Sequence, residues 1–168
     1  YGASIGWVQN VNNTLEVEYL RGTVSVPFFV DDLGKFKDER LSLIRRSYFG
    51  SNSFNLSYGI SYFRMGIRFG NEILSRLSGP VPAGVDFMKT EAFGINLGIG
   101  NRWSINKSLT FAIDWISLAQ PIITTKSESE YLKYVSNAND RDNADTAETV
   151  MKYFPRLVLF KLQLGIVF

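Results

Sequence analysis

Apolar and polar residues alternate along most of this chain. Leu15, Val17 and Tyr19 alternate with Glu16 and Glu18, for example. A β-strand points successive side chains to opposite faces, so this period of two predicts strands with one apolar and one polar face. The same pattern predicts seven strands, within residues 1–9, 15–28, 41–49, 54–68, 93–103, 109–115 and 160–168.

The polar segments between these strands alternate in length. Short turns are expected near residues 11, 52 and 106, and long loops at Asp31–Arg40, Asn71–Lys89 and Thr124–Thr149. Consecutive strands joined in this way form an antiparallel up-and-down sheet, with the short turns at one end and the long loops at the other.

The alternation shifts at two points and is ambiguous at a third. The apolar face changes parity near Gly22, where a bulge would explain the shift, and again near Phe63. In segment 41–49 either parity sends one arginine, Arg45 or Arg46, toward the apolar side, so its orientation stays open.

The length of 168 residues suits one domain covering the whole chain, and it suits eight strands of the smallest membrane barrels. Bacterial barrels have an even number of strands. Either a first strand preceded Tyr1, or two short strands are merged within Tyr19–Phe28; we favour the first explanation. The chain begins without Met, so we expect the processed or trimmed product of an exported precursor.

The last nine residues carry the most specific signal. Phe160, Leu162, Leu164, Ile166 and the terminal Phe168 share one face. This segment resembles the closing strand of bacterial outer-membrane β-barrels, in which a final Phe is recognised by the barrel assembly machinery. The hairpin from Gly98–Trp103 to Asp114–Trp115 fits the same class, although Ile166 stands where an aromatic residue is frequent. The chain therefore resembles the small eight-stranded barrels of the OmpA, OmpX and OmpW class.

That resemblance implies an all-β, antiparallel up-and-down transmembrane β-barrel in the bacterial outer membrane. Its apolar face would meet lipid and lipopolysaccharide, and its polar face would line a narrow lumen. Trp7, Trp103 and Trp115 are expected to form an aromatic girdle at the membrane surface. The long external loops would contact any protein partner.

The polar faces carry charges of both signs. A small barrel is filled by its own side chains, and a buried charge without a counter-charge costs several kcal/mol. We therefore expect a structural ion-pair network in the lumen, rather than an ion path or a gate. Its expected members are Glu16, Glu18, Arg64, Arg68, Arg102, Asp114 and Lys161. A three-residue turn at Ile105–Lys107 would place Arg102 opposite Thr110 and Asp114 opposite Gly98, so the partners of both charges should lie on other strands.

The amino-acid composition excludes several classes of function. The chain has no His and no Cys, which excludes Ser-His and Cys-His nucleophiles and His-ligated metals. Asp140, Asp142 and Asp145 lack the spacing of an EF-hand, so no metal or cofactor is expected. A net charge of +2 without a dense basic stripe gives no case for nucleic acid.

The sequence therefore predicts a non-catalytic integral outer-membrane barrel that acts as a structural or loop-mediated binding scaffold. A narrow pore for small solutes is the first alternative. A soluble lipocalin-like barrel, with the apolar face inside, is the second.

Overall fold

In the part of the chain that it describes, the computed structural model forms a single sheet of seven antiparallel strands. It describes residues 1–10, 12–25, 34–49, 53–69, 88–106, 108–129, 142, 145–146, 148–149 and 152–166. The strands are β1 (Gly2–Asn10), β2 (Asn13–Ser25), β3 (Gly34–Tyr48), β4 (Phe54–Phe69), β5 (Met88–Ser104), β6 (Leu109–Glu128) and β7 (Arg156–Ile166). They pair in chain order, each with the next.

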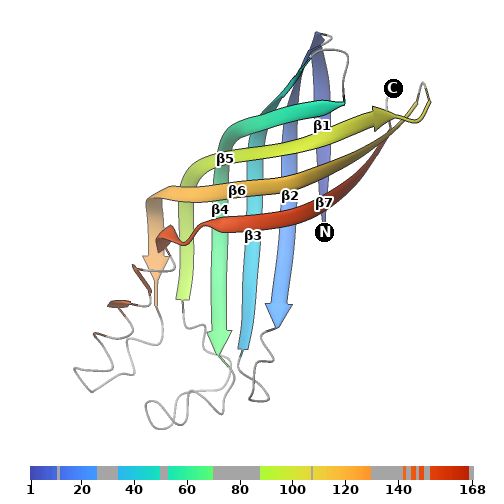
Figure 1. The fold of residues 1–168 in the computed structure, drawn as a ribbon. Coiled ribbons are helices and arrows are strands. Elements are labelled where there is room, and N and C mark those ends of the chain that lie inside the picture. Colours follow the sequence, from blue (N-terminus) through green and yellow to red (C-terminus); the bar gives the residue numbers. More distant parts are fainter. Residues whose placement is uncertain are drawn as a thin grey trace.

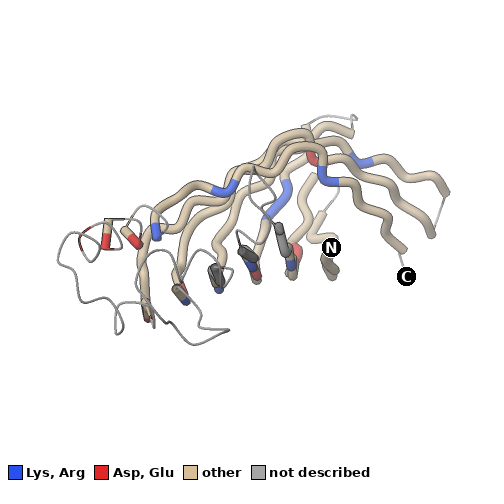
Figure 2. Tube along the Cα trace, turned by 90° about the horizontal axis from the view of Figure 1, so that it is seen from below, with Lys and Arg blue, Asp and Glu red and all other residues tan. Residues whose placement is uncertain are grey.

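The sheet is curled into an open half-barrel (Figures 1 and 2). Short connections join β1 to β2, β3 to β4 and β5 to β6 at one end, as predicted. The other connections, 26–33, 70–87 and 129–155, are longer and are mostly outside the described residues. β1 and β7 run in the same direction, and no pairing between them is found among the described residues.

Three strands, β3, β5 and β6, extend further toward the long loops than the sequence pattern predicted. β3 begins at Gly34, β5 at Met88, and β6 continues to Glu128, so parts of all three predicted loops are strand. Their charged outward residues made these strand ends look like loops, because the pattern was expected to be apolar on one face throughout.

Neither predicted parity change occurs. β2 pairs with β3 from Asn13 to Ser25 without interruption, and β4 pairs with β3 without interruption through Phe63. Phe63 is fully buried on the inner face, where it packs with Met65, Ala92 and Ala119. The prediction failed there because it assumed that every large apolar residue faces outward.

The register shifts instead at three points where β5 pairs with β6, and one of them is a bulge at Trp115. Ile99 pairs with Ile116 but Gly100 pairs with Asp114, which leaves Trp115 as an extra residue. On β7, the strand that pairs with β6, Phe160 lies beside this bulge. Its φ of 57° is an uncommon backbone conformation for a residue other than Gly. The Trp115 and Phe160 rings contact each other edge to face, with centroids 6.1 Å apart. The bulge lets both aromatic side chains stay on the outer face while Asp114 and Lys161 point inward.

Candidate functional site: a charge cluster on the inner face

The inner face of the half-barrel carries a cluster of ion pairs centred on Arg46. Its side chain is 1% exposed. It donates to Glu16 Oε2 at 2.8 Å, to Asp114 Oδ1 and Oδ2 at 2.6 and 3.0 Å, and to Asn55 Oδ1 at 3.1 Å. The planar guanidinium therefore holds one carboxylate in two-point contact and a second through its Nε. Strand alternation brings the four residues to one face from β2, β3, β4 and β6.

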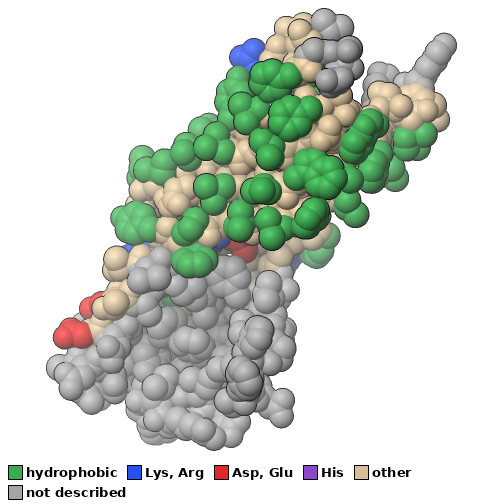
Figure 3. Space-filling view, viewed as in Figure 1, with side chains coloured by type: hydrophobic (Ala, Val, Ile, Leu, Met, Phe, Trp, Pro, Cys, Tyr) green, Lys and Arg blue, Asp and Glu red, His purple; other side chains and the backbone are tan. Residues whose placement is uncertain are grey.

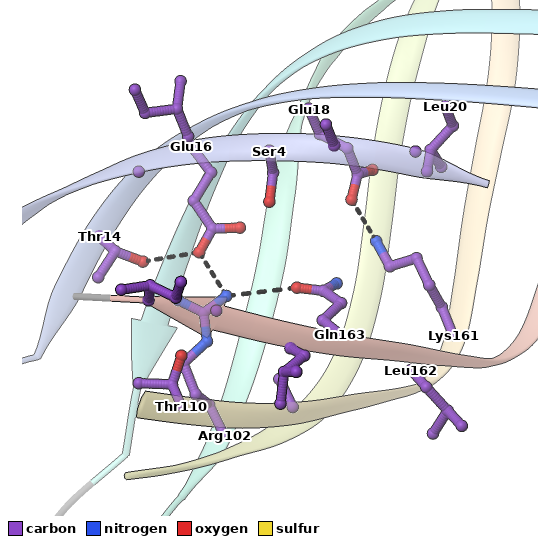
Figure 4. Close-up of a pocket in the computed structure, with 18 of the residues that line it drawn as sticks. Ser4, Thr14, Glu16, Glu18, Leu20, Arg102, Thr110, Lys161, Leu162 and Gln163 are labelled. Atoms are coloured by element: carbon purple, nitrogen blue, oxygen red, sulfur yellow. Dashed lines mark hydrogen bonds and ion pairs between the residues drawn. The ribbon is translucent and has the colours of Figure 1, made fainter. Parts of the chain in front are cut away.

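A second set of contacts extends the cluster to β5 and β7, and two of them, Lys161 to Glu18 and Arg102 to Glu16, join strands that are not neighbours. Lys161 of β7 lies 2.5 Å from Glu18 of β2 and 2.8 Å from Asp114 of β6. Arg102 of β5 lies 2.7 Å from Glu16 of β2. Figure 4 shows Arg102 and Lys161 reaching Glu16 and Glu18 from the opposite wall. These contacts connect the two ends of the curled sheet.

The structure brings together five of the seven charges that the sequence assigned to the lumen. They are Glu16, Glu18, Arg102, Asp114 and Lys161. The side chain of Arg68 lies outside the described residues.

The inward assignment of Arg64 was wrong, because its side chain is 61% exposed on the outer face. It was assigned inward through the parity change near Phe63, which does not exist. Arg64 lies near Glu39 and Glu91 instead, at 3.9 and 3.6 Å.

The sequence interpretation missed two members, Arg40 and Arg46. Arg46 was missed because its neighbour Arg45 made the parity of the segment ambiguous; the structure points Arg46 inward and leaves Arg45 exposed. Arg40 is 4% exposed and lies 3.7 Å from Glu18. The signal that could have found both was present: two inward glutamates on β2 require cations, and β3 is the adjacent strand.

The predicted register of the β5–β6 hairpin was wrong by two residues. Arg102 pairs with Ala112 and Asp114 with Gly100, because Ser104 pairs with Thr110 and the turn is longer than predicted. The conclusion drawn from that register is nevertheless confirmed. Arg102 and Asp114 find their counter-charges on other strands, Glu16 on β2 and Arg46 on β3.

A groove of about 2150 Å³ runs along the inner face beside β1, β2 and β7. The groove exists in part because β1 lines it with the small residues Gly2, Ser4 and Gly6. Glu16 and Glu18 of β2 form part of its floor. The inner carboxylates Glu16, Glu18 and Asp114 each lie within ion-pair distance of two cations. In the described part of the chain, no group of three or more His, Cys, Asp or Glu side chains is arranged to hold a metal ion.

The outer face is apolar over most of the sheet (Figure 3). The predicted girdle residues Trp7, Trp103 and Trp115 are all exposed, as are Phe160, Leu162, Leu164 and Ile166 of the terminal strand. Phe168 lies outside the described residues. Among the described residues, no helix has the length and apolar character needed to cross a bilayer.

The predicted binding loops lie largely outside the described residues. One described contact ties the last of them to the sheet: Ser127 of β6 donates to Glu148, which also lies 2.7 Å from Lys152. Burial alone would raise the pKa of the Glu148 carboxyl, but the hydrogen bonds from Lys152 and Ser127 outweigh that effect and lower the pKa below its usual range.

The fold and the inner cluster define an all-β, up-and-down half-barrel with a charged interior. Comparison with known proteins adds nothing to this description: no family model, no curated protein and no solved structure matches the chain.

Proposed function

We propose that this protein is a non-catalytic integral outer-membrane β-barrel that serves as a structural or loop-binding scaffold. The observation that carries the proposal is the inverted distribution of polarity. Charges are buried on the inner face, and large apolar side chains are exposed on the outer one. In a membrane the outer face of a barrel contacts hydrocarbon instead of water, so an apolar outer face and a polar interior are the stable arrangement there.

The inverted distribution argues against a soluble ligand-binding barrel. Such a barrel places its apolar face inside, whereas this interior holds Glu16, Arg46 and Asp114. In water the exposed face would form an apolar patch far larger than the few hundred Å² that soluble monomers usually expose. Leu97, Ile95 and Leu164, on β5 and β7, are 49, 43 and 73% exposed.

A closed barrel is part of the proposal, since open sheet edges are not tolerated in hydrocarbon. β1 and β7 run in the same direction, so antiparallel closure requires a strand that runs opposite to both. That strand would cover the groove along β1 and β7. The apolar terminal face of β7 would present the signal read by the assembly machinery, and the external loops would contact partners.

We further propose that the lumen is filled rather than open. The contacts from Lys161 to Glu18 and from Arg102 to Glu16 cross the interior, and Phe63 and Met65 fill it nearer the long loops. The narrow pore remains the second candidate, because the groove beside β1 and β7 is a continuous space on the inner face.

The first test is gel migration of the detergent-extracted protein with and without boiling. A closed membrane barrel resists SDS until it is heated, so the expected result is a shift in mobility on boiling. Absence of a shift, with the protein in the aqueous fraction, would overturn the membrane assignment. Planar-bilayer recordings then separate the two candidates: the filled lumen predicts a conductance equal to that of bare bilayer.

A further inference from the structure

The outer face carries one row of charges that crosses five strands in exact register. Arg21 of β2 pairs with Glu39 of β3, Glu39 with Arg64 of β4, Arg64 with Glu91 of β5, and Glu91 with Lys126 of β6. We call these five residues the outer ladder. Its charges alternate in sign from strand to strand, and this arrangement stabilises cross-strand neighbours.

The outer ladder lies at the edge of the apolar surface. Nearer the short turns, the outer face carries an apolar row made of Tyr19, Leu41, Tyr62, Phe93 and Ile123. This row lies two residues from the ladder on β2 to β5 and three residues from it on β6, where the register shifts. The Tyr62 and Phe93 rings contact each other at 5.2 Å, and Tyr62 donates to Glu91 of the ladder at 2.5 Å. On the other side of the ladder, two residues nearer the long loops, lies a second charged row. It includes Lys37 of β3, Lys89 of β5 and Glu128 of β6. The surface therefore passes from apolar through aromatic to charged along the strands.

The ladder contacts are loose compared with those of the interior. Arg21 lies 3.4 Å from Glu39, and Arg64 lies 3.9 and 3.6 Å from Glu39 and Glu91. The inner pairs of Arg46, Arg102 and Lys161 lie at 2.5–2.8 Å. A guanidinium has five N–H donors, and contacts beyond about 3.2 Å do not occupy them as hydrogen bonds. Arg21 and Arg64 therefore keep N–H donors for another acceptor, whereas Lys126 lies 3.0 Å from Glu128 in the next row.

Resting on the membrane assignment above, we propose that the outer ladder binds the phosphate groups of anionic lipids at the long-loop surface of the membrane. Arg binds phosphate through two parallel N–H donors, and Lys binds it as a point charge. Cations outnumber carboxylates in the ladder and in the row beyond it, which matches an anionic surface. Glu39 and Glu91 space the cations so that they do not repel one another.

The position of the apolar row indicates which part of a lipid molecule lies beside the ladder. Aromatic side chains such as Tyr62 gather where acyl chains give way to headgroups. Charges one register step further along the strands therefore stand at the level of the phosphates. Strands of small barrels tilt by about 35–45°, so a row in register climbs obliquely around the barrel and spans a band of depths.

The test uses the full chain folded in neutral detergent micelles and two probes, diphosphoryl lipid A and lipid A stripped of both phosphates. Bound lipid is counted by native mass spectrometry across a titration. The test variant replaces the three cations together, Arg21→Gln, Arg64→Gln and Lys126→Gln. The control variant is Arg45→Gln, which removes an exposed arginine of β3 outside the ladder.

The expected result is tighter binding of the phosphorylated probe, at least a tenfold loss of affinity in the triple variant and little change in the control. Raising salt should weaken binding of the phosphorylated probe alone. Equal binding of both probes, or equal losses in the triple and control variants, would overturn the ladder proposal. Failure of the membrane assignment is distinguishable, because the protein would then show no heat-dependent gel shift and would not enter micelles.

Discussion

Removing Arg46 should be among the most damaging single changes to the inner cluster. The Arg46→Ala variant would lose four hydrogen bonds and leave Glu16 and Asp114 without their central cation. Breaking a buried ion pair from one side costs about 3–5 kcal/mol. Glu16 keeps Arg102 and Asp114 keeps Lys161, so we expect a loss near the lower end, about 3 kcal/mol.

The chain supplies a matched control one residue away. Arg45 is the same residue type on the same strand, but its side chain is exposed on the outer face. The Arg45→Ala variant should therefore change stability by less than about 0.5 kcal/mol, or should increase it in a bilayer. An Arg46→Lys variant should fall between the two, because it keeps the charge and loses the two-point contact with Asp114.

The assay is equilibrium urea unfolding in detergent micelles, followed by tryptophan fluorescence and by gel mobility. The midpoint should fall with an unchanged slope, which shows that stability has changed rather than the unfolded state. A loss below about 1 kcal/mol in Arg46→Ala, or the same loss in Arg45→Ala, would refute the assignment of Arg46 to a buried hub.

Three further outcomes can be checked. In bilayers, Arg45→Leu should stabilise the fold by up to about 2 kcal/mol, since under the proposed membrane assignment it removes a charge from the face that would meet lipid. Destabilisation in urea titrations of vesicle-bound protein would contradict this. Gly59→Ala should cost about 1–3 kcal/mol, because the new methyl would stand 2.0 Å from the Leu43 carbonyl oxygen, whereas Gly66→Ala on the same strand meets no atom closer than 3.9 Å and should be tolerated in the same titration. Lipids brominated at different acyl depths should quench the fluorescence of Trp7, Trp103 and Trp115 most strongly when the bromines lie near the headgroups. Strongest quenching by bromines at the bilayer centre would contradict the proposed aromatic girdle.

The period of two was enough to predict the fold class and the order of the strands. It succeeded because each strand separates polar and apolar side chains between two different environments. It failed where the inner face is itself apolar. Phe63 and Met65 belong to a buried cluster, and interpreting Phe63 as an outward residue reversed the assignment of Arg64.

The candidate site could be predicted in kind but not in detail. Inward charges of both signs were evident from the alternation, and five of them meet as expected. Arg46, the centre of the cluster, was missed because local alternation gives no preference between two adjacent arginines. The choice depends on Glu16 and Asp114, which are contributed by strands far away in the sequence. Only the curled sheet brings those partners together.

The inner cluster also explains why the sheet is curled. Neighbouring strands would pair equally well in a flatter sheet, since their backbone hydrogen bonds do not depend on the far wall. The contact between Lys161 and Glu18 joins β7 to β2, and that between Arg102 and Glu16 joins β5 to β2. Flattening the sheet would separate these charges and break the pairs that join non-neighbouring strands. The pairs thus favour the curved form, so the charged side chains on the inner face also hold the two walls of the half-barrel at a fixed separation.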